Sequence, residues 1–268
     1  MASAQSQGLS KRQACKLLRC HRGFRVFDKV FKRNKELTKC IHKESKKHRF
    51  AGYQSIWGVL RGQGWLVNHK RVYRIWKEEG LIWPRRRSYN KLRLGTKREF
   101  EAKAPGDVWA LDFMHDSTRT GQKLKILTGI DEFTRQAVAL HPATSIPTKT
   151  LIEQLEKTIA KQGKPKTIRT DNGPEFTSLS FKRWLECQGI KHNLIAPGKP
   201  WQNGNNESFN NTTRRELLNA ELFENVLEAR VLHQEFKHYY NHQRPHTSLG
   251  CKSPMEFTKN WYSQNALN

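Results

Sequence analysis

The chain has 268 residues, and its 36% hydrophobic and 10% aromatic content excludes a globally disordered protein. Its 49 Lys and Arg against 24 Asp and Glu give a net charge of +25, which argues against an enzyme of small metabolites and indicates a polyanionic partner. No apolar run reaches the ~20 residues that span a bilayer, so we expect no membrane segment.

The positive charge is concentrated in the N-terminal part of the chain. Residues 1–104 carry 28 Lys and Arg against 7 Asp and Glu, a balance of +21, whereas residues 105–268 carry a balance of +4. We therefore expect the first part to bind phosphate and the second to tolerate a carboxylate site. The five cysteines lack disulfide or zinc-finger spacing, which favours the reducing cytoplasm.

The predicted elements of the N-terminal part are all helical. Ser10 and Gln13 have the spacing of a capping box at a helix start. Apolar residues within 27–41 recur at near-helical spacing and predict a longer, strongly basic helix. Two short helices follow over 53–62 and 68–80, joined by a glycine-containing turn. Such a pair is typical of a helix-turn-helix, with an ordinary helical hairpin as the alternative.

A basic stretch follows these helices and is expected to act as a linker along a phosphate backbone. DNA contacts are predicted at the basic side chains of the second short helix and of this stretch, namely Lys70, Arg71, Arg74, Arg85, Arg86 and Arg87. The chain is expected to divide into a basic helical region at 1–49, a helix-turn-helix-like domain at 50–83 and a linker at 84–104. A catalytic core at 105–223 and a C-terminal helix with tail at 224–268 are expected to follow.

The pattern changes at Pro105 to strands mixed with helices. Strands are predicted at 108–113, 124–130, 136–140, 167–170 and 190–196. Helices are predicted after a capping box at Thr150 and Glu153, around 181–185, and over 203–218 and 226–240. Three consecutive strands indicate an antiparallel meander, and the later alternation indicates parallel additions. The predicted fold class is therefore α/β, a mixed sheet covered by helices.

Three acidic residues stand out by their placement in these elements. Asp112 interrupts an apolar strand, where an uncompensated carboxylate is costly. Asp171 ends a strand in Asp-Asn-Gly, which is also an ordinary turn sequence. Glu207 lies near the start of a helix, where it also suits the helix dipole. Each has a structural explanation alone, but together they form a pattern of strand Asp, strand-end Asp and helical Glu.

The surrounding motifs extend this pattern. The segments TDNGPEF at 170–176, PGKPWQN at 197–203 and ESFN at 207–210, with 35 residues between Asp171 and Glu207, resemble the integrase core of insertion-sequence transposases of the IS-three type. RPHTSLG at 244–250 and SPMEF at 253–257 resemble the C-terminal signature of that family, and 50–83 resembles its helix-turn-helix. The resemblance covers most of the chain. It implies a ribonuclease H-like fold and a triad of metal-binding catalytic acids, Asp112, Asp171 and Glu207.

The chemistry of phosphodiester transfer explains why such acids are needed. The reaction requires a poised oxygen nucleophile and a stabilised leaving oxygen, and two Mg²⁺ ions ~3.5–4 Å apart can serve both. Carboxylates supply the hard oxygen ligands that Mg²⁺ prefers, and we expect Mn²⁺ to substitute. We predict that the strand residue Asp112 bridges the ions.

Residues near Glu207 are predicted to contact DNA. Arg214 matches a basic position that the family uses on DNA, and it shares a helix face with Glu207 because seven residues make about two turns. Trp201, Gln202 and Asn203 precede the catalytic helix and could position DNA ends, with a loop packed on the sheet as the alternative.

The function implied by the resemblance is cutting and joining of DNA at the ends of an insertion sequence. The expected partners are double-stranded DNA of the element ends and target, further copies of the chain, and an upstream-frame protein, separate or fused. Gln54 and Ser55 replace usual basic residues, so we expect little end preference from this chain alone. The expected location is the bacterial nucleoid. The alternatives are a DNA-binding protein or repressor with an inactive core, and a plain ribonuclease H-type nuclease.

Overall fold

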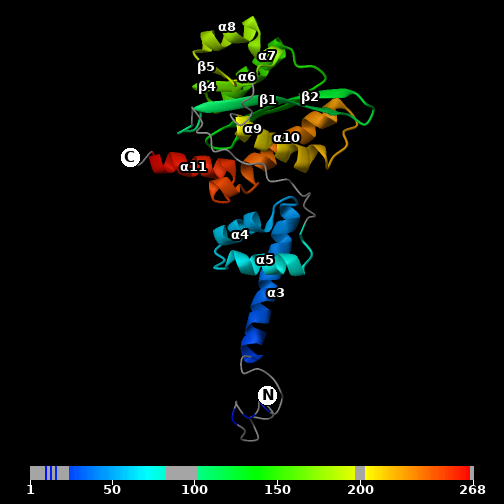
Figure 1. Cartoon of the computed structure of the whole chain (residues 1–268), viewed down its shortest axis with the longest axis vertical. Coiled ribbons are helices and arrows are strands. Elements are labelled where there is room, and N and C mark those ends of the chain that lie inside the picture. Colours follow the sequence, from blue (N-terminus) through cyan, green and yellow to red (C-terminus); the bar gives the residue numbers. More distant parts are fainter. Residues whose placement is uncertain are drawn as a thin grey trace. The chain divides into compact units, whose positions relative to one another are not determined.

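The computed structural model describes residues 24–82, 102–196 and 203–265, together with Ser10, Gln13 and Lys16 (Figure 1). It divides into two compact units, Met1–Pro84 and Arg85–Asn268. Ser10 and Gln13 exchange the two hydrogen bonds of the predicted capping box, 3.0 Å from Ser10 N and 3.3 Å from Gln13 N. Among the helices in these ranges, none has both the length and the apolar character that crossing a bilayer requires.

The first unit contains the helices α3 (Phe24–Lys47), α4 (Tyr53–Gly62) and α5 (His69–Glu78). Asn68 caps the start of α5, because its side chain accepts a hydrogen bond from Lys70 N at 2.9 Å. Apolar faces of the three helices share one core, built from Leu37, Ile41, Ile56, Leu60, Val72, Ile75 and Trp76. The helix pair α4 and α5 therefore packs on α3 and leaves Lys70 and Arg74 exposed.

The second unit is built on a five-stranded mixed sheet with the order β3-β2-β1-β4-β5. Its strands are β1 (Val108–Ser117), β2 (Lys123–Asp131), β3 (Ala137–Ala143), β4 (Thr167–Thr170) and β5 (Lys191–Leu194). The first three strands pair antiparallel, and β4 and β5 join parallel to β1. The predicted meander with parallel additions is therefore confirmed.

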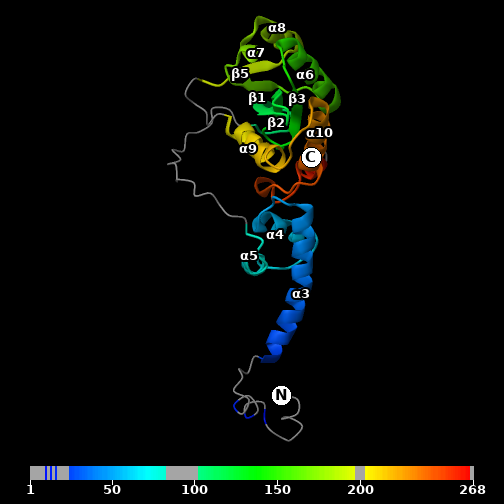
Figure 2. The same cartoon turned by 90° about the vertical axis from the view of Figure 1, so that its right-hand side faces the viewer.

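Helices cover both faces of this sheet (Figure 2). One face packs against α6 (Thr148–Gln162), α7 (Pro174–Thr177) and α8 (Leu179–Gln188). The other packs against α9 (Gly204–Thr213), the π-helical turn η2 (Arg214–Leu218) and α10 (Val226–His242). A 3-10 turn, η3 (Thr247–Leu249), and α11 (Pro254–Asn265) complete the unit. Trp109 and Leu111 face the first layer, while Ala110 and Met114 face the second, as side chains of a strand must alternate.

Some predicted details of this unit were wrong. The capping box at Thr150 is not a helix start, because α6 already begins at Thr148 and Leu151 N bonds to Pro147 O at 3.0 Å. The extended Pro147 ends the preceding segment and sets the start of the helix. The short helix α7, the π turn η2 and the helix α11 were not predicted.

Candidate active site

Asp112 lies in the middle of β1 and points toward the α9 side of the sheet. Its neighbours Ala110 and Met114 pack in one cluster with Phe209 of α9, so the alternation of β1 places Asp112 on the same face. Its Oδ1 accepts a hydrogen bond from Phe113 N at 2.8 Å, and its Oδ2 accepts one from Asn210 Nδ2 of α9 at 2.9 Å. Both carboxylate oxygens are thus held in place.

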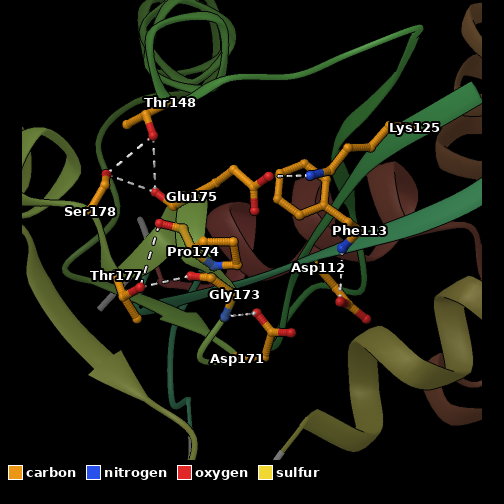
Figure 3. A network of polar contacts seen from close by, with 10 residues as sticks. All are labelled: Asp112, Phe113, Lys125, Thr148, Asp171, Gly173, Pro174, Glu175, Thr177 and Ser178. Carbon is orange, nitrogen blue, oxygen red and sulfur yellow. Dashed lines mark hydrogen bonds and ion pairs between the residues drawn. The ribbon is translucent and has the colours of Figure 1, made fainter.

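Asp171 directly follows β4 and lies beside Asp112. The parallel register sets Ala110 opposite Arg169, so two residues further along each chain Asp112 and Asp171 are level. Burial raises the pKa of Asp112, the Phe113 N–H lowers it, and the negative charge of Asp171 raises it again, with a net rise. Figure 3 shows both carboxylates on the same side of the strands. The sheet therefore brings two of the three predicted acids together.

The turn that carries Asp171 is fixed by its own side chain. Asp171 Oδ1 accepts a hydrogen bond from Gly173 N at 3.0 Å, the Asx-turn that Asp-Asn-Gly predicts. Asn172 Nδ2 donates to Ile195 O at 3.0 Å and ties the turn to the segment after β5. Asp171 itself remains exposed and accessible to a ligand.

An ion pair supports this turn from the reverse face of the sheet (Figure 3). Lys125 of β2 forms an ion pair with Glu175 of α7. Burial raises the pKa of Glu175, but the hydrogen bond and charge of Lys125 outweigh burial, so the pKa lies below its ordinary value. The Lys125 ammonium also lies 4.1 Å from the centroid of the Phe113 ring, which stacks on Phe176 at 4.9 Å. The sequence neighbours of Asp112 and of the Asp171 turn are thus packed together.

Glu207 lies in the first turn of α9 and is exposed. Asn210, one turn later, contacts Asp112, so α9 runs beside that aspartate. Within the described ranges, however, no group of three His, Cys, Asp or Glu side chains is close enough to hold a metal ion. The structure therefore pairs Asp112 with Asp171 and leaves Glu207 on the adjacent helix.

Arg214 begins the π turn after α9 and lies against β1. Its Nη2 donates to His115 O at 3.2 Å, and the side chain is otherwise exposed. Asn203 precedes α9 and is half-buried. Trp201 and Gln202 lie outside the described residues. The DNA-contacting roles of these residues stay predictions.

The predicted DNA-contacting residues of the first unit differ in their surroundings. Lys70 and Arg74 are exposed on α5. The Arg71 guanidinium instead donates to Asn34 Oδ1 of α3, at 2.8 Å from Nε. Arg85, Arg86 and Arg87, which follow the first unit and are also predicted to contact DNA, lie outside the described part of the chain.

Three residues of the site were missed by sequence reasoning. Asn210 could have been found, because it lies one turn after Glu207 and so shares its side of the helix. Glu175 lies in the TDNGPEF motif, but no sequence signal pairs it with Lys125, because 50 residues separate them and only the folded sheet brings them together.

Comparisons with known proteins agree with this architecture. Two family models described as "Integrase core domain" match residues 102–200 and 188–254, and a model described as "HTH-like domain" matches residues 32–89. A chain in the cryo-EM structure of the simian T-cell lymphotropic virus intasome is similar with a TM-score of 0.51 and 18% identity, covering 82% of this chain and 74% of that chain. The predicted fold class, a ribonuclease H-like mixed sheet with an N-terminal helix-turn-helix-like unit, is confirmed.

Curated relatives cover between 78% and 97% of the chain. An insertion element IS476 protein of Xanthomonas euvesicatoria is 36% identical over 97% of this chain and 75% of its own length. An insertion element IS407 protein of Burkholderia multivorans is 34% identical over 96% of this chain and 93% of its own length. The transposase for insertion sequence element IS904 of Lactococcus lactis is 29% identical over 78% of this chain and 87% of its own length.

Proposed function

The chain belongs to the insertion-element transposases with an integrase core, and from this premise we propose that it cuts and joins DNA strands with Asp112, Asp171 and Glu207 as its catalytic acids. The observation that carries the proposal is the pair of level carboxylates on β1 and at the end of β4. The negative charge of Asp171 disfavours the charged form of Asp112, and a bound cation would offset this repulsion.

The donor set suits a hard divalent cation. Asp112 and Asp171 offer carboxylate oxygens side by side, which is the ligand chemistry that Mg²⁺ prefers, and Mn²⁺ takes similar ligands. Glu207 is the third proposed ligand, because α9 lies against Asp112 through Asn210. When bound, two such ions activate the attacking oxygen and stabilise the leaving oxygen of a phosphodiester.

The chain's own residues prepare the site in three ways. Asn210 and Phe113 N–H fix the Asp112 carboxylate, and Gly173 N–H fixes that of Asp171. Arg214 sits against β1 with an exposed guanidinium that suits a backbone phosphate. The same acids can serve water in strand cutting and a DNA 3′-hydroxyl in joining.

In this proposal, the first unit provides most of the binding to duplex DNA. The exposed Lys70 and Arg74 lie on α5, the second helix of the helix-turn-helix-like pair, which commonly enters the major groove. The predicted contacts of Arg71, Arg85, Arg86, Arg87, Trp201, Gln202 and Asn203 remain part of the proposal. Such a DNA-bound protein would be found at the bacterial nucleoid.

End recognition is proposed to need more than one copy or a second polypeptide. A single small DNA-binding module buries only ~600–1,000 Å² of protein surface, which is little for a specific site. We therefore expect an upstream-frame protein, separate or fused, to add specificity, and copies of the chain to assemble on paired ends. A competition shift assay with terminal-repeat and scrambled duplexes tests this, and strong discrimination by the isolated chain would refute it.

The experiment for the main proposal is joining of an oligonucleotide 3′ end into plasmid DNA. We expect joining with Mg²⁺ or Mn²⁺ and none in EDTA. The alternative is a DNA-binding protein or repressor with an inactive core. That protein would neither cut nor join, and a ribonuclease H-type nuclease would cut without joining.

A further inference from the structure

One residue of the C-terminal signature at 244–250 makes a buried, charged contact with the turn that follows α9. Arg244 forms a fork on Glu216, with Nε 2.8 Å from Oε2 and Nη2 2.8 Å from Oε1. The Glu216 side chain is 2% exposed and that of Arg244 is 16% exposed. Two parallel bonds between planar groups fix orientation as well as distance.

The charges of this pair depend on each other. Burial alone raises the pKa of Glu216, but the hydrogen bonds and charges of Arg244 and then of Arg215 lower it below its ordinary value. Arg215 also donates to Glu216 Oε1 at 2.6 Å, but its side chain is 58% exposed. Arg244 is therefore the buried partner on which the Glu216 carboxylate relies.

Glu216 lies inside the π turn that continues α9. Asn219 N bonds to Arg214 O at 2.8 Å, five residues back, so the turn is wider than in an α-helix. The turn begins at Arg214, which is held to β1, and follows the helix of Glu207. A wide turn needs external support, and the Arg244 fork supplies it from the C-terminal signature.

The inner face of α9 buries polar side chains beside the apolar Phe209. Asn206 and Thr213 are fully buried there, and among the described residues Asn206 Oδ1 and Nδ2 and Thr213 Oγ1 have no hydrogen-bond partner. Unpaired buried polar groups weaken packing. Phe209 is the apolar contact, and its ring meets that of Tyr240 at 4.9 Å.

The signature also reaches α9 through Tyr240. The His246 ring packs edge-on against Tyr240 at 4.7 Å, and the Arg244 guanidinium lies 5.6 Å from the same ring. Tyr240 in turn contacts Phe209 of α9. The motif thus holds the catalytic helix at both its middle and its π-helical end.

We propose that Arg244 is a positioning residue for the proposed transfer reaction: by locking Glu216 it fixes the π turn, and through it the orientation of Glu207 and Arg214 toward the aspartates. Arg244 touches no reacting group in this arrangement. The inference rests on the proposed function for its catalytic consequence, but its structural part is independent of activity.

The test compares Arg244→Lys with Arg215→Lys, two variants that keep the charge beside Glu216 and differ in burial. Hydrogen exchange of amides in α9 and η2, thermal unfolding, DNA affinity, and the KM and kcat of strand joining are measured in the full chain. For Arg244→Lys we expect faster exchange over residues 204–218 with β1 unchanged, DNA affinity and KM unchanged, and kcat lower on the order of 10²-fold, as for a ~1 Å misplacement. Arg215→Lys should match wild type.

Wild-type exchange in α9 and η2 together with wild-type kcat for Arg244→Lys would overturn the inference. So would a uniform rise in exchange over the whole unit, since that is general destabilisation. If Arg244→Lys does not fold, Glu216→Gln tests the same lock from its other side, with the same expected exchange pattern. A wild-type chain that never joins DNA would refute the proposed function, while the exchange pattern would still decide the positioning role.

Discussion

Asn210 of α9 donates its side-chain amide to Oδ2 of Asp112 on β1 at 2.9 Å, although 98 residues separate the two in sequence. This bond connects the helix of Glu207 to the strand of Asp112. Its acceptor is a partly buried carboxylate, which makes the bond charge-assisted.

We predict that Asn210→Ala lowers the free energy of unfolding by about 1.5 kcal/mol, the lower end for a hydrogen bond to a charged group. Strand joining should slow as well, because Asp112 loses one of its two holding contacts. Urea unfolding and the joining rate check this. Asn211→Ala, exposed on the same helix, is the matched control, and equal effects from both variants would contradict the prediction.

The Lys125–Glu175 pair should couple β2 to the Asp171 turn measurably. Its side chains are 19% and 21% exposed, against 64% and 55% for the Arg119–Glu224 pair. In a double-mutant cycle of Lys125→Met and Glu175→Gln we expect a coupling of about 1 kcal/mol, and clearly less for the exposed pair. Equal couplings in the two cycles would show that the pair near Asp171 is an ordinary surface contact.

Stability should fall in mild acid because of two buried histidines. Burial lowers the pKa of His233 to about 4, and burial with the Arg244 charge lowers that of His246 to about 3, both from an ordinary 6.5. The unfolded chain therefore takes up protons first, so stability is complete above pH 6.5 and declines as the pH falls toward the folded values.

Each histidine contributes a slope of about 1.4 kcal/mol per pH unit within that window. Urea midpoints at pH 7 and pH 5 should show the decline, and His233→Leu should flatten it. An unchanged slope in that variant would mean that His233 titrates normally in the folded chain.

The salt dependence of DNA binding should distinguish the basic residues of α5 that contact phosphate from those that do not. Each phosphate contact adds about −0.9 to the slope of log K against log salt, so Lys70→Gln and Arg74→Gln should each make the slope shallower by about that amount. Arg71→Gln should in addition destabilise the first unit, because its guanidinium holds Asn34. Fluorescence anisotropy over a salt series measures the slopes, and no change for Lys70 and Arg74 would place the phosphate contacts elsewhere.

Local sequence signals predicted the elements whose two ends are marked by glycine, proline or a turn sequence. The strand Thr167–Thr170 was predicted with its bounds, because Gly163 and Pro165 precede it and Asp-Asn-Gly follows. The start of α6 was wrong because Pro147, rather than Thr150, ends the extended segment. The π turn η2 escaped prediction because five residues are too few to reveal a change of helical period.

The acidic residues of the candidate site could be predicted from the sequence, whereas the residues that hold their surroundings in place could not. Asp112 and Asp171 stand out as a carboxylate in an apolar strand and one at a strand end. Glu175 and Arg244 lie within motifs that carry the resemblance, but nothing in the sequence pairs them with Lys125 and Glu216, which lie 50 and 28 residues away. Such pairings follow from strand order and helix packing, which a single sequence does not reveal.

Joining of a 3′ end by acid variants tests the central claim most directly. The variants Asp112→Asn, Asp171→Asn and Glu207→Gln are compared with the control Asp116→Asn. Asp116 lies four residues after Asp112 on β1, and its carboxylate accepts a hydrogen bond from Ser117 N. We predict that each of the three abolishes joining with Mg²⁺ and with Mn²⁺ while retaining the fold and DNA affinity, and that Asp116→Asn joins normally. Near-wild-type joining by any of the three would contradict the account of that residue as a catalytic acid.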